Sequence, residues 1–103
     1  MDRIEKLNEF LQSNPADSFV RHALALEYVK LGDDLAARKL FEELLEKDPT
    51  YVGSYYHLAK LLERNNAAEE AIRCYEKGME QAKKMRDEHA WQELRGAYEE
   101  LTM

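Results

Sequence analysis

The sequence predicts an all-α fold, a solenoid of helical hairpins with about six helices in a single domain over residues 1–103. Three observations lead to this class. A pattern of small and apolar residues returns after 34 residues. Each period holds two segments whose apolar residues are spaced three and four apart, as on one face of a helix. Pro15 and Pro49 stand one period apart at the ends of such segments, where proline stops a helix.

The composition fits a helical protein and argues against several functional classes. Hydrophobic residues make up 45% and charged residues 35% of the chain, and four glycines and two prolines leave little room for strands or long loops. The net charge of −6 argues against nucleic-acid binding, which needs clustered Lys and Arg. No apolar run is long enough for a membrane span or signal peptide, and one cysteine forms no internal disulfide. We therefore expect a cytoplasmic protein that binds neither nucleic acid nor membrane.

The first predicted element is a helix over residues 2–13, which forms an N-terminal half repeat over residues 2–15. Asp2 is a candidate N-cap, with Glu5 three residues later as in a capping box. The helix aligns with the second helix of the following repeat, so we expect it to shield the end of the stack. Its apolar stripe consists of Ile4, Leu7, Phe10 and Leu11.

The first full repeat covers residues 18–51, with helices predicted over about 17–31 and 34–47. Gly32 between them is expected to take the left-handed conformation, and Asp33 to cap the second helix. Ala25 is small enough for a partner backbone to come close. The set predicted to be buried in the second helix is Leu35, Ala37, Leu40, Phe41, Leu44 and Leu45.

The second repeat covers residues 52–85, with helices predicted over 51–64 and 67–84. Thr50 is a candidate cap for the first of them, and Asn66 with Glu69 resembles a capping pair for the second. The predicted buried positions are Tyr55, Leu58, Ala59 and Leu62, then Ala71, Cys74, Tyr75 and Met79.

A C-terminal capping helix is predicted over residues 87–101, on the stripe Trp91, Leu94, Tyr98 and Leu101. This stripe comes two residues later than a strict 34-residue repeat requires. We expect a break over residues 84–87, because a break explains the shift. A continuous helix is the alternative, since no glycine or proline enforces a stop there.

The run Leu24-Ala25-x-x-Tyr28, followed by Ala37-x-x-x-Phe41 and Pro49, resembles a tetratricopeptide repeat. Leu58-Ala59-x-x-Leu62 with Ala71-x-x-x-Tyr75 is similar to a second copy. Arg21 and Lys83 depart from the pattern, at an apolar position and at the closing proline. The resemblance implies a right-handed stack without catalytic residues, in which the first helix of each repeat lines a concave groove that takes up a peptide or helix.

The candidate site is the face that the resemblance assigns to this groove. Its aromatic and aliphatic side chains beside a few cations suit a protein partner of apolar and acidic character. One alternative is that Phe19 and Leu26 pack against the end of a neighbouring helix. Another is that the face meets a second copy of the chain in a homodimer. The predicted residues are Phe19, His22, Leu26, Lys30, Tyr56, His57, Lys60 and Arg64.

Members of this family that bind chaperone tails clamp a free carboxylate with Lys, Asn and further basic residues on the first helices. The matching places in this sequence hold His22, Leu26, His57, His89 and Glu93. Leu26 offers no hydrogen bond and Glu93 would repel a carboxylate, so we expect no such clamp.

Other reactive side chains suggest no chemistry. His22, His57 and His89 lie on the three helices of the first type, but nothing in the sequence makes them converge on one ion. Cys74 is expected to be a structural thiol, and paired glutamates such as Glu42 and Glu43 to face solvent. We expect neither an enzyme nor a bound metal or cofactor.

Overall fold

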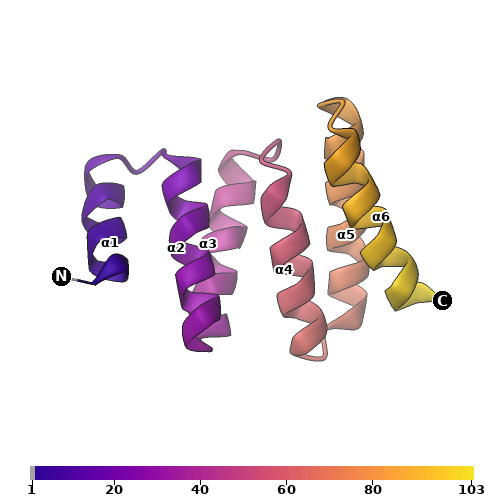
Figure 1. The fold of residues 1–103 in the computed structure, drawn as a ribbon, viewed down its shortest axis with the longest axis horizontal. Helices are drawn as coiled ribbons and strands as arrows, with labels where there is room; N and C mark the ends of the chain where they lie inside the picture. Colours follow the sequence, from indigo (N-terminus) through magenta and orange to yellow (C-terminus); the bar gives the residue numbers. More distant parts are fainter. Residues whose placement is uncertain (1) are drawn as a thin grey trace. The chain divides into compact units, whose positions relative to one another are not determined.

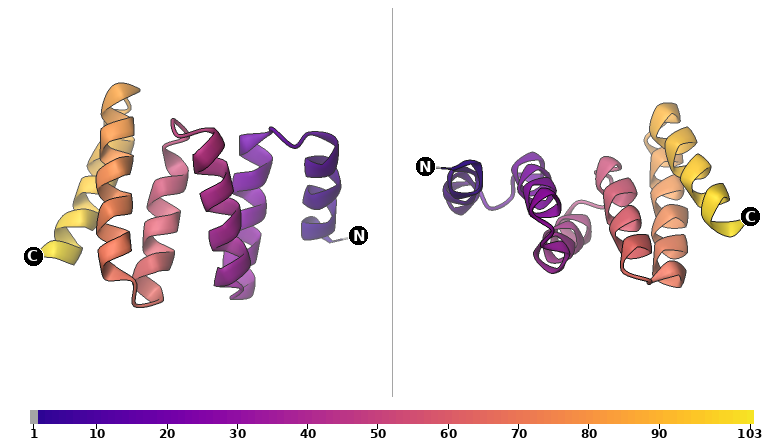
Figure 2. Two further views of the ribbon diagram at one scale, coloured as in Figure 1. Left: turned by 180° about the vertical axis from the view of Figure 1, so that it is seen from behind. Right: turned by 60° about the horizontal axis from the view of Figure 1, so that its bottom comes forward.

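The structure, a computed structural model, describes residues 2–103. These residues form six α-helices and no strand, and consecutive helices within each unit run antiparallel (Figures 1 and 2). The predicted all-α helical-repeat fold is confirmed. The helices are α1 (Arg3–Ser13), α2 (Ser18–Leu31), α3 (Asp34–Lys47), α4 (Gly53–Arg64), α5 (Ala68–Lys84) and α6 (Glu88–Thr102).

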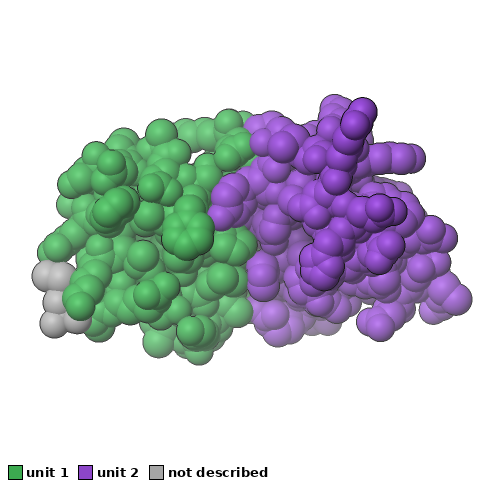
Figure 3. Space-filling model, turned by 45° about the horizontal axis from the view of Figure 1, so that its top comes forward, with its two compact units in different colours: residues 1–48 green, residues 49–103 purple. Residues whose placement is uncertain are grey.

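The chain divides into two compact units, coloured separately in Figure 3. Unit 1 is Met1–Asp48 and unit 2 is Pro49–Met103, so the boundary falls at the proline that stops α3. In unit 1, α2 packs against both α1 and α3. In unit 2, α5 packs against both α4 and α6, and α4 also touches α6.

Small residues allow the helices of each hairpin to pack closely. Ala25 and Ala37 in unit 1, and Ala59 and Ala71 in unit 2, are completely buried, as the repeat register predicts. Gly78 is a further close-contact position that the sequence did not reveal. A Cβ atom at Gly78 would lie 2.7 Å from the Cβ of Tyr55, so α5 meets α4 backbone against side chain.

Three helices, α2, α4 and α5, end in the same way. Gly32, Asn66 and Arg86 have φ values of 80°, 63° and 56°, and each follows the end of a helix. The amide of the next residue donates to a carbonyl five residues back, as in Asp33 N to Tyr28 O at 2.9 Å. The prediction for Gly32 is confirmed. Arg86 also ends α5, because this conformation interrupts the helix, so the continuous-helix alternative is wrong.

Side-chain caps begin four of the helices and are missing from the other two. The predicted caps at Thr50 and Asn66 are wrong, because α4 follows Val52 and α5 follows Ala67 with no side-chain cap. Asn66 occupies the left-handed position of its turn instead, and backbone bonds such as Ser54 N to Tyr51 O at 3.2 Å open α4. The capping carboxylates are those of Asp2, Asp17, Asp33 and Asp87.

Burial follows the predicted stripes with a few exceptions. Leu35 was predicted to be buried, yet it is 82% exposed, because it lies in the first turn of α3 next to the exposed hairpin turn. Leu40, Cys74 and Met79 are half-buried rather than buried. Ser54, Leu61, Gly78 and Ala82 are buried without having been predicted.

Candidate functional site

Four of the predicted site residues lie on α2 in unit 1, and they differ in their surroundings. Phe19 is 70% exposed, and Lys30 is also exposed. His22 and Leu26 are half-buried. The His22 ring meets the buried ring of Phe41 edge to face, with centroids 5.7 Å apart. His22 is therefore part of the wall of the hairpin core, whereas Phe19 is available for contact.

Lys30 carries its charge beside an acid that was not among the predicted site residues. Its ammonium lies 3.1 Å from a carboxylate oxygen of Glu27, one turn earlier on α2. Glu27 also pairs with Arg3 of α1 at 3.6 Å. The spacing of three residues between Glu27 and Lys30 was the available signal. The charge of the α2 face is thus mixed rather than simply basic.

The other four predicted residues lie on α4 in unit 2, where three of them touch. The rings of Tyr56 and His57 meet edge to face, with centroids 5.6 Å apart. The Lys60 ammonium lies 5.7 Å from the centroid of the Tyr56 ring and 3.7 Å from a Glu63 carboxylate oxygen. Arg64 is exposed at the end of the helix. The α4 face is therefore an aromatic surface edged by cations.

Burial sets the protonation of two groups around α4. Burial lowers the pKa of His57, and the carboxylate of Glu93 opposes this only partly. His57 is therefore neutral at pH 7. Burial also raises the pKa of Tyr75, and its hydrogen bond to Glu63 raises it further. Glu63 thus accepts from the Tyr75 hydroxyl and attracts Lys60 at the same time.

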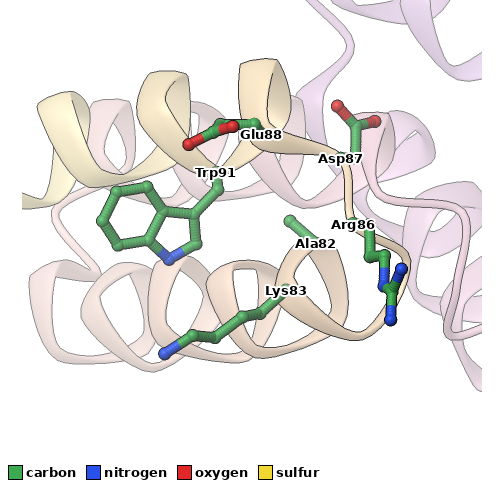
Figure 4. A pocket seen from close by; sticks show the side chains of 6 residues that line it. All are labelled: Ala82, Lys83, Arg86, Asp87, Glu88 and Trp91. Carbon is green, nitrogen blue, oxygen red and sulfur yellow. The ribbon is translucent and has the colours of Figure 1, made fainter.

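A pocket at the α5–α6 turn was not anticipated from the sequence (Figure 4). Its volume is about 370 Å³, and the indole of Trp91 forms one wall above α5. The Arg95 guanidinium lies 5.2 Å from the centre of the Trp91 rings. The only tryptophan of the chain was a signal that pointed to this region. The lining residues are Ala82, Lys83, Arg86, Asp87, Glu88 and Trp91.

A second pocket lies between α1 and α2 in unit 1, and we call it the α1–α2 pocket. Its volume is about 530 Å³. Phe19 lines it, so this predicted site residue faces a neighbouring helix, as one of the sequence alternatives proposed, although that helix is α1. The lining residues are Arg3, Lys6, Leu7, Phe10, Asp17, Phe19 and Val20.

Within residues 2–103, no three His, Cys, Asp or Glu side chains come together in a way that could hold a metal ion. None of the six helices over these residues is both long and apolar enough to cross a membrane.

Comparison with known proteins identifies the repeat. The family described as tetratricopeptide repeat matches residues 28–98. A tetratricopeptide repeat domain protein from Salinibacter ruber, solved in solution, is 43% identical with a TM-score of 0.82, covering 85% of this chain and 89% of that one. A Bordetella parapertussis protein superposes with a TM-score of 0.83 over 98% of this chain and 88% of that chain, but at 24% identity it shows the fold alone.

One curated protein shares a shorter stretch. The mouse aspartyl/asparaginyl beta-hydroxylase is 30% identical over 74 residues, which are 72% of this chain. The match spans only 10% of that protein's length.

Proposed function

The chain belongs to the tetratricopeptide repeat family, and from this we propose that it binds an apolar, acidic segment of a partner protein through the α2 and α4 faces. Proteins of this family generally serve as interaction modules and are generally non-enzymatic. We propose the same for this chain, with no catalytic role. Its cytoplasmic location stays a prediction.

The observation that carries the proposal is the apolar surface left on α2. Phe19 is 70% exposed and Leu26 half-buried, on a helix whose buried residues are Val20, Leu24 and Ala25. Exposed aromatic and aliphatic side chains on a rigid helix are typical anchors for a partner. On α4, Tyr56 with Lys60 offers an aromatic surface beside a cation.

The protonation of His57 supports an apolar partner over a carboxylate clamp. A clamp needs cationic or amide donors, and His57 is neutral at pH 7 because burial lowers its pKa. Leu26 donates no hydrogen bond. The lysines at the edge are paired with Glu27 and Glu63, so they would attract an acidic side chain only weakly.

A selection experiment tests the proposal. A displayed library of random 16-residue peptides is selected on the parent protein, and the recovered peptides are then measured on Leu26→Glu. We expect apolar and acidic peptides whose affinity falls at least about tenfold with Leu26→Glu. Leu31→Glu is the matched control, since Leu31 lies on the same helix but outside the predicted face. Lys60→Ala should weaken binding mildly, and more at low salt.

Three results would contradict the proposal. The first is equal binding by the parent and Leu26→Glu. The second is equal loss of binding in the Leu31→Glu control. The third is tight binding of a peptide with a free C-terminal carboxylate and not of its amide, since this would indicate a clamp.

The alternative function is self-association through the same faces. Sedimentation of the parent at several concentrations separates the two functions. A dimer that Leu26→Glu converts to monomer would favour the alternative.

A further inference from the structure

The α1–α2 pocket of unit 1 has a filled counterpart in unit 2. Two periods of 34 residues further along the chain, α5 occupies the register of α1, and α6 follows α5 as α2 follows α1. In unit 2, α4 packs against both α5 and α6. Unit 1 has no described helix in the position equivalent to α4. The α1 residues that line the α1–α2 pocket correspond in the 34-residue register to α5 residues beside α4, so the register matches the pocket to the place of that helix.

The residues that α5 offers to α4 show what such a site looks like when it is occupied. Ala71 and Tyr75 are completely buried, and the Cys74 thiol donates to the Tyr55 carbonyl at 3.4 Å. A Cβ at Gly78 would meet Tyr55. At the corresponding places α1 carries Arg3, Leu7, Lys6 and Phe10, and all four line the pocket.

Where α5 has small side chains facing α4, α1 has cationic and aromatic ones. Phe10 is 51% exposed, and with the exposed Phe19 it gives the pocket an apolar wall of two phenyl rings. Lys6 is exposed, and no hydrogen bond or ion pair engages its ammonium within residues 2–103. Arg3 pairs with Glu27 but keeps 64% of its side chain exposed.

Asp17 is the single acid of the lining, and its carboxylate already accepts the Val20 amide at 3.0 Å as the cap of α2. The pocket therefore combines an apolar wall with two cations, one of which has no partner among residues 2–103. An occupant with acidic side chains flanking an apolar stripe would complement both features.

We propose that the α1–α2 pocket is a docking site for an acidic amphipathic helix of a partner protein, laid in the position that α4 fills in unit 2. The filled counterpart indicates that the occupant is helical, and the charges indicate that it is acidic. The larger side chains of α1 keep this helix further from the α1 backbone than Gly78 keeps α4 from α5. This site shares Phe19 with the face of the proposed function, but it also depends on α1, which that face does not include.

The test uses two labelled synthetic helical peptides of 16 residues with the same leucine stripe. One has glutamate at its remaining positions and the other has lysine. Fluorescence anisotropy is measured with the full chain. We expect the glutamate peptide to bind and the lysine peptide to bind at least about tenfold more weakly. Backbone amide resonances that shift on titration should lie in α1 and the first turn of α2.

Variants on α1 locate the binding. Phe10→Ala and Lys6→Glu should each weaken the glutamate peptide about tenfold or more. Lys77→Glu makes the same charge change at an exposed position of α5, and it should leave binding unchanged. Phe10 contributes little to the core, so circular dichroism should show the parent's helix content in all variants.

Unchanged binding in both α1 variants would overturn the proposal, and so would equal binding of the two peptides. Shifts centred on Leu26 rather than α1 would assign the peptide to the face of the proposed function instead. Sedimentation gives a further check. A self-associating parent that Phe10→Ala renders monomeric would make the occupant a second copy and overturn the assignment to a partner.

Discussion

The two hairpins, α2 with α3 and α4 with α5, solve one packing problem with different residues. Tyr55 in α4 lies against Gly78, which has no side chain to obstruct it. One period earlier the same two places hold Arg21 and Leu44. Leu44 is buried, and the Arg21 side chain is only 11% exposed. Unit 2 thus pairs a tyrosine with a glycine, whereas unit 1 has an arginine and a leucine at the same two places.

The polar ends of Arg21 and Tyr55 make equivalent hydrogen bonds in the two hairpins. The Tyr55 hydroxyl donates to the carbonyl of Pro49 at 2.7 Å. The Arg21 guanidinium donates to the carbonyl of Pro15 at 2.8 Å, and Pro15 is the residue one period before Pro49. Arg21 looked like a departure from the repeat in the sequence. Arg21 preserves the hydrogen bond to the proline carbonyl, and what differs is the packing of the side chain between the two helices.

The largest effect is expected from removing the side chain that fills unit 1. Leu44→Ala should lower the free energy of unfolding by about 2–5 kcal/mol, because it leaves a cavity against Arg21 and the helix core. Urea unfolding followed by circular dichroism measures this. A loss below about 1 kcal/mol would mean that α2 collapses onto the vacated space, and that the two hairpins do not differ as described.

The opposite change in unit 2 should cost less. Gly78→Ala places a Cβ against the Tyr55 Cβ, and overpacking of this kind costs about 1–3 kcal/mol. Gly96→Ala in α6 is the control, because its Cβ would meet nothing within 4 Å. It should stabilise the helix by about 0.5–1 kcal/mol. Equal stabilisation by both alanines would refute the close contact of α4 with α5.

Substitutions at two of the turns should change the free energy of unfolding by less, and in opposite directions. Gly32→Ala forces a side chain into φ of 80° and should cost about 1 kcal/mol. Arg86→Gly relieves a non-glycine residue at φ of 56° and should gain up to about 1 kcal/mol. Urea midpoints should move in opposite directions. Trp91 fluorescence reports unit 2 in the same titrations, and midpoints that differ from those of circular dichroism would show that the units unfold separately.

The smallest effect concerns pH and His57. Its pKa is lowered from 6.5 in the folded state, so the unfolded chain takes up the proton first as the pH falls. Stability should therefore fall as the pH drops below about 6.5 and stay level with respect to this group above it. His57→Gln should flatten the urea midpoint between about pH 7 and pH 5. An equally steep dependence in that variant would assign the effect to other groups.

Much of the fold could be predicted because its signals are local. Asp2 and Asp33 precede helices as capping residues, and Gly32 marks a turn whose positive φ costs glycine little. The break at Arg86 could only be inferred from a shift in the apolar stripe, because arginine is not a residue that favours the left-handed conformation.

The exposure of side chains on the predicted faces was harder to predict, since it depends on which other helix packs beside them. Phe19 and Leu26 stand on the same helix, yet only Phe19 lines the pocket beside α1. Leu35 follows the helical period and is exposed because the hairpin ends there. The role of Gly78 depends on Tyr55 from another helix, and no spacing within α5 could reveal it.

Cys74 provides a chemical probe of the α4–α5 hairpin in unit 2. It is the single thiol of the chain, it is half-buried, and its sulfur donates to the Tyr55 carbonyl across the α4–α5 hairpin. Its packing against α4 slows a bulky thiol reagent, and opening of the α4–α5 hairpin exposes the sulfur further. A substitution that loosens the contact of α4 with α5 should therefore raise the rate of labelling in native buffer. Unit 1 has no thiol, so this rate belongs to unit 2 alone.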